Sequence, residues 1–338
     1  MSFPFNLYLL TFGSAFLAAL VSLPAWRRWC ERIGLVDDPG HRKIHEQPVP
    51  LAGGFCVMTG LVVPILSGVA AVALNGNLMG IGIGALLNQL TGPDTADLLQ
   101  YGLQRRAWQL IAIFLGASGM FLLGWLDDKH ELGPAAKFSG QFLIAVLVAA
   151  SGIRITLFVP NALFSYAVTV LWILTVTNAF NFMDNMNGLC AGLGAIGSWQ
   201  LGLSAAIHGQ YLVATLAFSI AGALLGFLPH NFPRATAFLG DAGSHLVGYL
   251  LAVLAILPHF YSEEHPNVWA VLMPLLIMAI PLGDLVWVVL LRWRIGQPFY
   301  VGDTNHLSHR LARLGLSRSA SVTLIWLMAA VLGSIAFL

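Results

Sequence analysis

Residues 119–134, GMFLLGWLDDKHELGP, decide the fold of this 338-residue chain. They close an apolar run, because the nineteen residues 108–126 carry no charge, and a run of that length is typical of a membrane-crossing helix. Two neighbouring aspartates, Asp127 and Asp128, follow at once. Adjacent carboxylates repel each other and are costly to bury, so a double negative charge at the end of an apolar helix indicates a functional requirement.

The composition agrees with a membrane protein. The chain is 58% hydrophobic and 9% charged, whereas a soluble domain is typically about 25% charged. We therefore predict an all-α polytopic membrane protein, with residues 1–338 as one integral-membrane domain. The net charge of +1 gives no acidic or basic balance that would point to nucleic acid. The three cysteines show no motif spacing and are expected to pack as small hydrophobic residues.

Apolar runs of roughly the 20 residues that a crossing needs predict about ten transmembrane helices. They lie near residues 5–25, 51–74, 107–126, 137–152, 157–177, 188–206, 211–228, 243–258, 268–291 and 320–338. The first run is predicted to be a retained helix and not a signal peptide, because it is too long and its positive charges, Arg27 and Arg28, follow it.

Lysine and arginine indicate the orientation, because they concentrate in cytoplasmic loops. Thirteen of the sixteen fall in alternate segments, which we assign to the inside, and this places both termini outside. The longest outer segment, residues 75–106, is predicted to hold an interfacial or re-entrant helix, since its apolar part is short and rich in glycine.

The unusual polar clusters all fall in the five inner segments, so we predict one site at the cytoplasmic membrane surface. A proton or ion pathway would instead place acidic residues through the bilayer. Only Asp284 lies well inside a predicted crossing, and it is expected to pair with Arg292, with Arg294 or with a polar group on a neighbouring helix.

Four aspartates, Asp127, Asp128, Asp184 and Asp241, stand at the mouths of three inner loops. Together they are unfavourable unless protons or a cation neutralise them, and hard oxygen ligands suit Mg²⁺, which in turn binds phosphates. The glycines of the AGG and GDAGS stretches allow close backbone approach at helix starts, where exposed N–H groups favour anions. Residue types alone thus predict a Mg²⁺–diphosphate site, with helix caps and interfacial charges as the competing interpretation.

Single members of these clusters have plain structural alternatives. A lone aspartate at a helix start, such as Asp241, more often caps the helix. His306 and His309 are three residues apart and would share a helix face, which fits phosphate binding and a solvated loop equally well. His45 alone fits a surface histidine. The Asp127–Asp128 pair is harder to explain, since one aspartate suffices to end a helix.

Taken together, the polar segments resemble the polyprenyl-phosphate N-acetylhexosamine-1-phosphate transferases, glycosyltransferase family 4. This family includes the enzymes that start O-antigen and teichoic-acid linkage synthesis with GlcNAc, and the related phospho-MurNAc-pentapeptide translocase. Six segments carry the resemblance, in order and over nearly the whole chain: RKIHEQPVPLAGG (42–54), GWLDDKHELGPAAKFSGQ (124–141), NAFNFMDNMNGL (178–189), NFPRATAFLGDAGS (231–244), PLGDLVWVVLLR (281–292) and NHLSHRLARLGLS (305–317).

Two segments depart from the family pattern. Where the family has Asp-Gly-x-Asp-Gly after Asn-x-x-Asn-x-x, this chain keeps the first Asp but has Asn185 for a Gly and Asn187 for the second Asp. Where the GlcNAc branch has His-x-His-His, this chain has Ser308 in place of the second His. Asn187 can hydrogen-bond a base or ribose but carries no charge, and Ser308 can donate to a phosphate oxygen but is never cationic. These changes bear on nucleotide or sugar preference and on activity.

The resemblance implies a role for each matching residue. The implied metal ligands are Asp241, Asp127 and Asp128, of which the last two could instead position the lipid phosphate. The residues implied to carry the reaction are Asp127, Asp128, Asp184, Lys137, His306 and His309. The residues implied to bind substrate are His45, Asn181, Asn187, Asn231, Phe238 (stacking on uracil), Ser308 and Arg310.

The resemblance implies transfer of a sugar 1-phosphate, GlcNAc 1-phosphate before others, from a UDP-sugar to undecaprenyl phosphate, with release of UMP. The expected cofactor is Mg²⁺, with Mn²⁺ as the alternative. The expected place is the bacterial cytoplasmic membrane, where the product starts a lipid-linked envelope glycan such as lipopolysaccharide; a homodimer is left open. The alternatives are another UDP-N-acetylhexosamine, an inactive lipid- or nucleotide-binding homologue, and a transporter.

Overall fold

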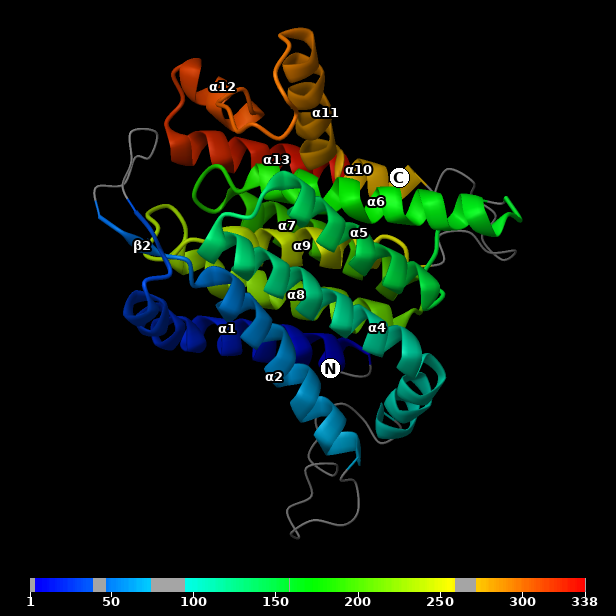
Figure 1. Cartoon of the computed structure of the whole chain (residues 1–338). Helices are drawn as coiled ribbons and strands as arrows, with labels where there is room; N and C mark the ends of the chain where they lie inside the picture. The colour runs from blue at the N-terminus through cyan, green and yellow to red at the C-terminus, as the bar shows by residue number, and fades with distance from the viewer. Residues whose placement is uncertain (1–3, 39–46, 74–94, 158, 259–271, 338) are drawn as a thin grey trace.

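The computed structural model describes residues 4–38, 47–73, 95–157, 159–258 and 272–337 (Figure 1). Within them the chain forms twelve α-helices, one 3-10 helix and one pair of short strands. Nine helices correspond one to one to predicted crossings: α1 (Phe5–Ile33), α2 (Gly53–Ala73), α4 (Thr95–His130), α5 (Pro134–Ala150), α6 (Ala162–Met183), α7 (Leu189–Ile207), α8 (Tyr211–Phe227), α9 (Gly240–Leu254) and α13 (Arg318–Ile335).

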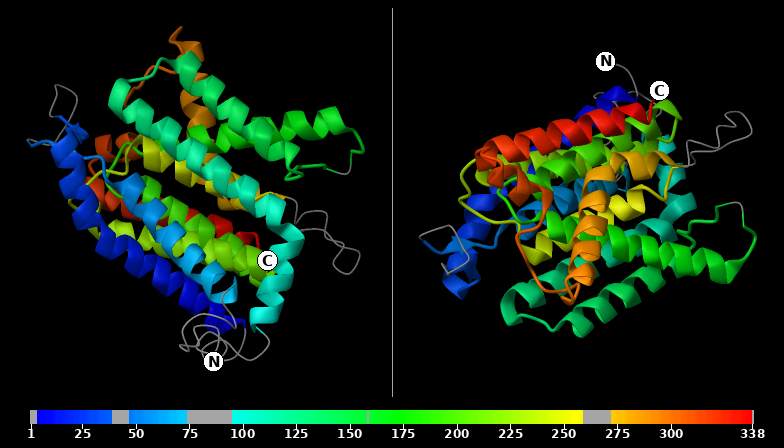
Figure 2. Two further views of the ribbon diagram at one scale, coloured as in Figure 1. Left: turned by 60° about the horizontal axis from the view of Figure 1, so that its bottom comes forward. Right: turned by 90° about the horizontal axis from the view of Figure 1, so that it is seen from above.

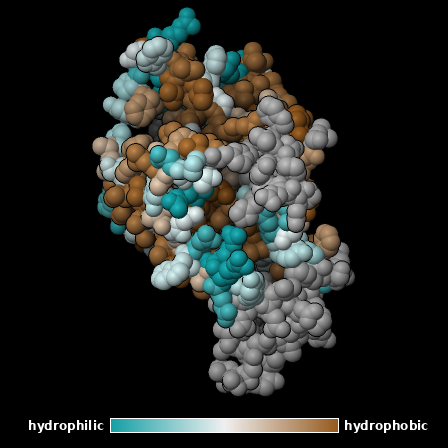
Figure 3. Space-filling view, turned by 90° about the vertical axis from the view of Figure 1, so that its right-hand side faces the viewer, coloured by the Kyte–Doolittle hydropathy of each residue, from teal (hydrophilic) through white to brown (hydrophobic). Residues whose placement is uncertain are grey.

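Six of the described helices are long and apolar enough to cross a membrane, and α2 and α5 are shorter apolar helices. Helices α1, α8, α7 and α13 follow one another side by side across the bundle (Figure 2). Many apolar side chains on the long helices are exposed, among them Val21 of α1, Leu115 of α4 and Leu171 of α6, as contact with lipid requires. Figure 3 shows one end of the molecule, where brown apolar and teal polar surfaces lie beside each other. The all-α polytopic prediction is confirmed, while the count of ten crossings and their orientation stay predictions.

The prediction of one helix over residues 268–291 is wrong. Within the described part of that range the chain forms α10 (Met273–Ile277) and α11 (Ala279–Arg294), separated by Met278 at φ −101° and ψ 19°. Pro281 lacks the N–H that would bond to the carbonyl four residues earlier, which favours a break here. Helix α11 projects from the bundle beside α12 (Leu307–Arg313), as Figure 1 shows. Apolar side chains such as Trp293 are exposed on α11.

The outer segment predicted over residues 75–106 is described only from residue 95 onwards. Residues 95–106 already belong to α4, which is interrupted by non-helical angles at Arg106 (φ −114°, ψ 15°). The predicted interfacial or re-entrant helix over its apolar part lies outside the described residues.

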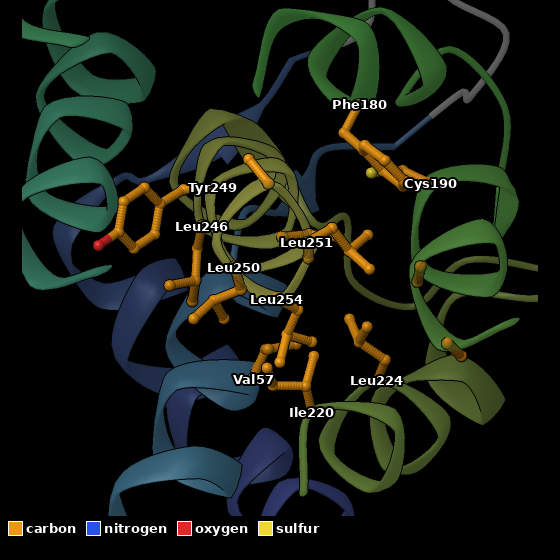
Figure 4. Close-up of a cluster of buried hydrophobic side chains, with 14 of the residues drawn as sticks. Val57, Phe180, Cys190, Ile220, Leu224, Leu246, Tyr249, Leu250, Leu251 and Leu254 are labelled. Carbon is orange, nitrogen blue, oxygen red and sulfur yellow. The ribbon is translucent and has the colours of Figure 1, made fainter. Parts of the chain in front are cut away.

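Helix α9 is the centre of the bundle. Every residue of α9 except Asp241 is buried, and the helix packs against α2, α4, α6 and α7. Leu246, Leu250 and Leu254 point from it into a cluster with Val57 of α2 and Ile220 of α8 (Figure 4). The one partly exposed residue of this buried helix is therefore a carboxylate at its first turn.

Glycines let the neighbouring helices approach the start of α9. A Cβ atom on Gly124 of α4 would lie 2.2 Å from the Asp241 carbonyl oxygen, and one on Gly54 of α2 would lie 2.7 Å from the Gly243 nitrogen. Real Cβ atoms do not come so close to backbone, so both positions require glycine. The polar segments of α4 and α9 meet because of this close packing.

A short sheet and two backbone hydrogen bonds connect the loops at the same end of the bundle. Strands β1 (Val36–Asp37) and β2 (Val49–Pro50) pair antiparallel. The amides of Gly53 and Gly54 donate to the carbonyls of Phe238 and Leu239, at 2.9 and 3.0 Å. The expectation that the AGG amides are open to anions is thus wrong, because the loop before α9 already accepts their hydrogens.

Candidate functional site

A lysine lies between two aspartates where α4, α5 and α9 meet. Lys137 Nζ is 2.6 Å from Asp127 Oδ2 and 2.9 Å from Asp241 Oδ2. Asn181, near the end of α6, donates to Asp241 Oδ1 at 2.6 Å and to the Ser244 hydroxyl at 2.9 Å. Four predicted site residues, from four elements, thus form one hydrogen-bonded cluster.

Asp128 points to the same place but makes different contacts. Its Oδ1 accepts the Asp241 amide at 2.8 Å and its Oδ2 accepts the Ala242 amide at 3.0 Å, so it caps α9 from α4. Gly240, at φ +72°, leaves the space for it, since a Cβ there would lie 2.8 Å from Asp128 Oδ2. Both oxygens are occupied, and the first amides of α9 are closed to an anion by the protein's own carboxylate.

Asp184 adds a further carboxylate at the end of α6. Burial raises the pKa of Asp184 well above its usual range, and the Asp241, Asp128 and Asp37 charges raise it further, while the Gly240 amide opposes them. Even with Asp184 protonated, the three carboxylates Asp127, Asp128 and Asp241 outnumber the one ammonium of Lys137.

This charge imbalance suits a divalent cation. One donor atom each from Asp127, Asp241 and His245 lie within 4.8 Å of one another. Carboxylate oxygens are the ligands that Mg²⁺ prefers, and a second positive charge would relieve the repulsion that Lys137 leaves. The residues present fit such an ion, with Asp127 and Asp241 as the candidate ligands.

Helix α12 carries the predicted histidine loop and is fixed to α11. Asp284 Oδ2 lies 2.6 Å from His306 Nδ1, and its Oδ1 accepts the Leu307 amide at 2.6 Å. Of the partners expected for Asp284, the polar group on a neighbouring element is confirmed. Arg292 instead bonds to Asp303 at 2.8 Å.

The two departures from the family pattern touch each other. The Ser308 hydroxyl donates to Asn185 Oδ1 at 2.6 Å, although 123 residues separate the two positions. Ser308 is buried, and the His306 ring packs edge to face on Phe182 of α6, with centroids 5.6 Å apart. Helix α12 is thereby attached beside Asp184, so the histidine loop and the carboxylate cluster belong to one end of the molecule.

The remaining α12 candidates line its less buried side. His309 is half-buried, and burial together with the charges of His306, Arg318 and Arg313 lowers its pKa. A neutral imidazole there can accept a proton or a hydrogen bond near pH 7. The Arg310 guanidinium lies 4.6 Å from the Trp287 ring centroid.

The residues that the resemblance implies for binding the nucleotide lie in a neighbouring layer of loops. Asn231 is buried and holds two loops together, since its Oδ1 accepts the Gly188 amide at 2.6 Å and its Nδ2 donates to the Ala237 carbonyl at 2.9 Å. Asn187 is more exposed and donates to the Pro233 carbonyl at 3.3 Å. Phe238 is partly exposed next to the α9 start. His45 lies outside the described residues.

Three residues one helical turn further into the bundle were given no role from the sequence, although two of them, Gln141 and Asn178, lie in segments that carry the resemblance. Gln141 approaches His245, with Nε2 atoms 3.3 Å apart, and Asn178 donates to Gln141 Oε1 at 2.7 Å. Gln141 and His245 follow Lys137 and Asp241 by four residues, and Asn178 precedes Asn181 by three. This spacing on shared helix faces was the available signal.

Comparisons with known proteins identify the family of this chain. Residues 110–259 match the model of glycosyl transferase family 4. The chain is 30% identical over 320 residues to the "Probable undecaprenyl-phosphate N-acetylglucosaminyl 1-phosphate transferase" of Bacillus subtilis, covering 92% of this chain and 79% of that protein.

Two further relatives cover similar shares. The decaprenyl-phosphate N-acetylglucosaminephosphotransferase of Mycobacterium tuberculosis (H37Rv) is 30% identical, over 89% of this chain and 74% of that protein. The undecaprenyl-phosphate alpha-N-acetylglucosaminyl 1-phosphate transferase of Escherichia coli K12 is 25% identical, over 96% and 82%.

Proposed function

Because this chain belongs to glycosyl transferase family 4, as a polyprenyl-phosphate N-acetylhexosamine-1-phosphate transferase, we propose that it transfers GlcNAc 1-phosphate from UDP-GlcNAc to undecaprenyl phosphate. UMP is the second product. The names of the three relatives above support GlcNAc as the sugar. Another UDP-N-acetylhexosamine is the alternative donor.

The observation that carries the proposal is the Asp127–Lys137–Asp241 cluster at the ends of apolar helices. A lipid phosphate lies at headgroup level, so groups that handle it must sit where helices leave the bilayer. The concentration of lysine and arginine in the same set of loops supports a cytoplasmic position for this end.

A divalent cation held by Asp127 and Asp241 would neutralise the diphosphate and stabilise the charge on the departing UMP. An oxygen of the lipid phosphate forms the new bond to the sugar-linked phosphorus, and the bond from that phosphorus to the bridging oxygen breaks. The lipid phosphate needs little help from a base, since its second pKa is about 6. Both Asp128 oxygens are bonded to amides, which supports direct attack and not a covalent intermediate on Asp128.

The other residues bind and orient the substrates. Lys137 can turn from the aspartates to the diphosphate, and His309 faces the same end of the bundle from α12. Asp184 and Phe238 border the start of α9 and are proposed to meet the nucleotide.

Purified protein should release UMP from UDP-GlcNAc only when undecaprenyl phosphate and Mg²⁺ are both present. Asp127→Asn and Asp241→Asn should each lower this rate by at least about a hundredfold, because each replaces a charged oxygen ligand of the cation by a neutral amide. Turnover with a different UDP-sugar and not with UDP-GlcNAc would show that the proposed donor is wrong. A folded protein that is inactive with every donor would refute the proposed activity.

The Asn185–Ser308 hydrogen bond argues against the inactive-homologue alternative. Decay of an unused site would leave its changed positions unrelated, whereas here two of the three altered side chains, Asn185 and Ser308, bond to each other at 2.6 Å. We therefore expect Asn185→Gly and Ser308→His each to lower kcat/KM by about tenfold, since each removes this bond and the second also places a larger ring at a buried position.

The double variant tests whether the two positions act as a pair. It carries the glycine and histidine of the family pattern, and glycine makes room for the ring, so its activity should return close to the wild-type value. The rates of UMP release by the wild type, the two single variants and the double variant give the coupling free energy between the two positions. Losses that simply add would argue against a coupled pair, and turnover found in the double variant alone would identify the wild-type chain as an inactive homologue.

A further inference from the structure

A second polar layer lies one turn further along α9, below the carboxylates. It consists of His245 on α9, Gln141 on α5 and Asn178 on α6. His245 and Gln141 have no exposed surface. Nothing in the proposed reaction uses these residues, yet such polar groups are rarely buried in an apolar bundle without a purpose.

The hydrogen bonds of this layer fix the tautomer of His245. The Leu174 carbonyl can only accept, so the Asn178 group 2.8 Å from it is the NH₂, and the same nitrogen donates to Gln141 Oε1 at 2.7 Å. Gln141 therefore turns its own NH₂ towards His245 Nε2, 3.3 Å away. Nε2 must accept this hydrogen, so the ring is neutral and its proton is on Nδ1.

His245 Nδ1 is buried and has no hydrogen-bond partner in the protein. A nitrogen that carries a proton cannot be a metal ligand, so a place for His245 in the cation's inner shell disagrees with this chain of hydrogen bonds. A ring nitrogen lies within 4.8 Å of carboxylate oxygens of Asp127 and Asp241, a separation that one bridging water spans. The N–H and the two carboxylates are the polar partners that a buried water needs.

We propose that His245 is a positioning residue, whose Nδ1–H holds a water against the Asp127 and Asp241 carboxylates from inside the bundle. Gln141 and Asn178 keep the ring in the donating tautomer. The carboxylates are thereby oriented towards the membrane surface, where the cation binds. The inference rests on the cation site of the proposed function, but its test does not require turnover.

The experiment measures Mn²⁺ binding by electron paramagnetic resonance, with and without UDP, beside the Mg²⁺ dependence of UMP release. His245→Leu removes the donor, and we expect weaker Mn²⁺ binding and about 10–100-fold more Mg²⁺ for half-maximal rate, with the KM for UDP-GlcNAc nearly unchanged once Mg²⁺ is saturating. His245→Asn keeps an N–H donor near the Nδ1 position and should recover most of the loss.

A spectroscopic signature separates positioning from ligation. Bound Mn²⁺ should show no coupling to a histidine nitrogen, and ¹⁵N spectra of labelled protein should contain a neutral ring protonated on Nδ1 that vanishes in His245→Asn. A directly coordinated nitrogen, or Mn²⁺ binding unaltered in His245→Leu, would overturn the inference. Weakened Mn²⁺ binding in a protein that turns over no donor would keep the inference and refute the proposed function.

Discussion

Asp128→Asn is expected to lower the turnover of UDP-GlcNAc and to leave the protein less thermally stable than Asp184→Asn does, because burial raises the pKa of both carboxyl groups but only Asp128 caps α9. Each oxygen of the Asp128 carboxylate accepts a backbone N–H, one from Asp241 and one from Ala242. An amide offers only one oxygen, so one N–H would face an NH₂ group inside the bundle, at a cost of about 1–3 kcal/mol. We expect kcat to fall about a hundredfold or more, because the turn that carries Asp241 would shift.

Asp184→Asn is the matched control, since it neutralises another carboxylate of the same site. Burial raises the pKa of Asp184, so its charged form destabilises the folded protein at neutral pH, and the variant should melt at a higher temperature there. This gain should shrink as the pH falls towards the usual carboxyl pKa of about 4, where the folded and unfolded chains both bind the proton. The measurement is the melting temperature of the wild type and of both variants at a series of pH values. An inactive Asp128→Asn that melts at the same temperature as Asp184→Asn would instead assign Asp128 a chemical role.

Gly124→Ala should be as damaging as the loss of a charged site residue. The added methyl would lie 2.2 Å from the Asp241 carbonyl oxygen, a backbone atom that cannot turn away, so α4 and α9 must separate. Overpacking of this kind costs about 1–3 kcal/mol or more, and Asp127 follows only three residues later. We expect a lower melting temperature and at least a hundredfold loss of UMP release.

Gly13→Ala on α1 is the control for this substitution. No atom lies within 4 Å of a Cβ at Gly13, so stability should stay the same or rise by up to about 1 kcal/mol from helix propensity. If Gly124→Ala behaved like Gly13→Ala, the close contact of α4 with the start of α9 would not be a condition for the site.

Much of the architecture could be predicted from apolar run lengths, and the cluster from the order of its motifs. Asp127, Lys137, Asn181 and Asp241 are brought together as expected, because each stands at the end of a helix at the same side of the bundle. The helix break at Met278 could not be read from hydropathy, since both halves are apolar and only the prolines on either side, Pro274 and Pro281, mark it.

The parts that sequence reasoning missed depend on hydrogen-bond partners in other elements. The amides of Gly53, Gly54 and Asp241 look available for anions in the sequence, but carbonyls and a carboxylate from distant segments accept them. The same limit applies to His245, which reads as one polar residue in an apolar helix until Gln141 is placed beside it.

Lys137 gives the resting site a built-in counter-ion. Its ammonium lies 2.6 and 2.9 Å from the two carboxylates that a metal would use, so a cation can enter only as the lysine is displaced. A displaced, largely buried ammonium needs a new anion, and the diphosphate of the proposed donor would supply one. Metal and nucleotide-sugar should therefore bind cooperatively, and each alone should bind weakly. Between turnovers the enzyme should then bind neither free metal ions nor UMP tightly.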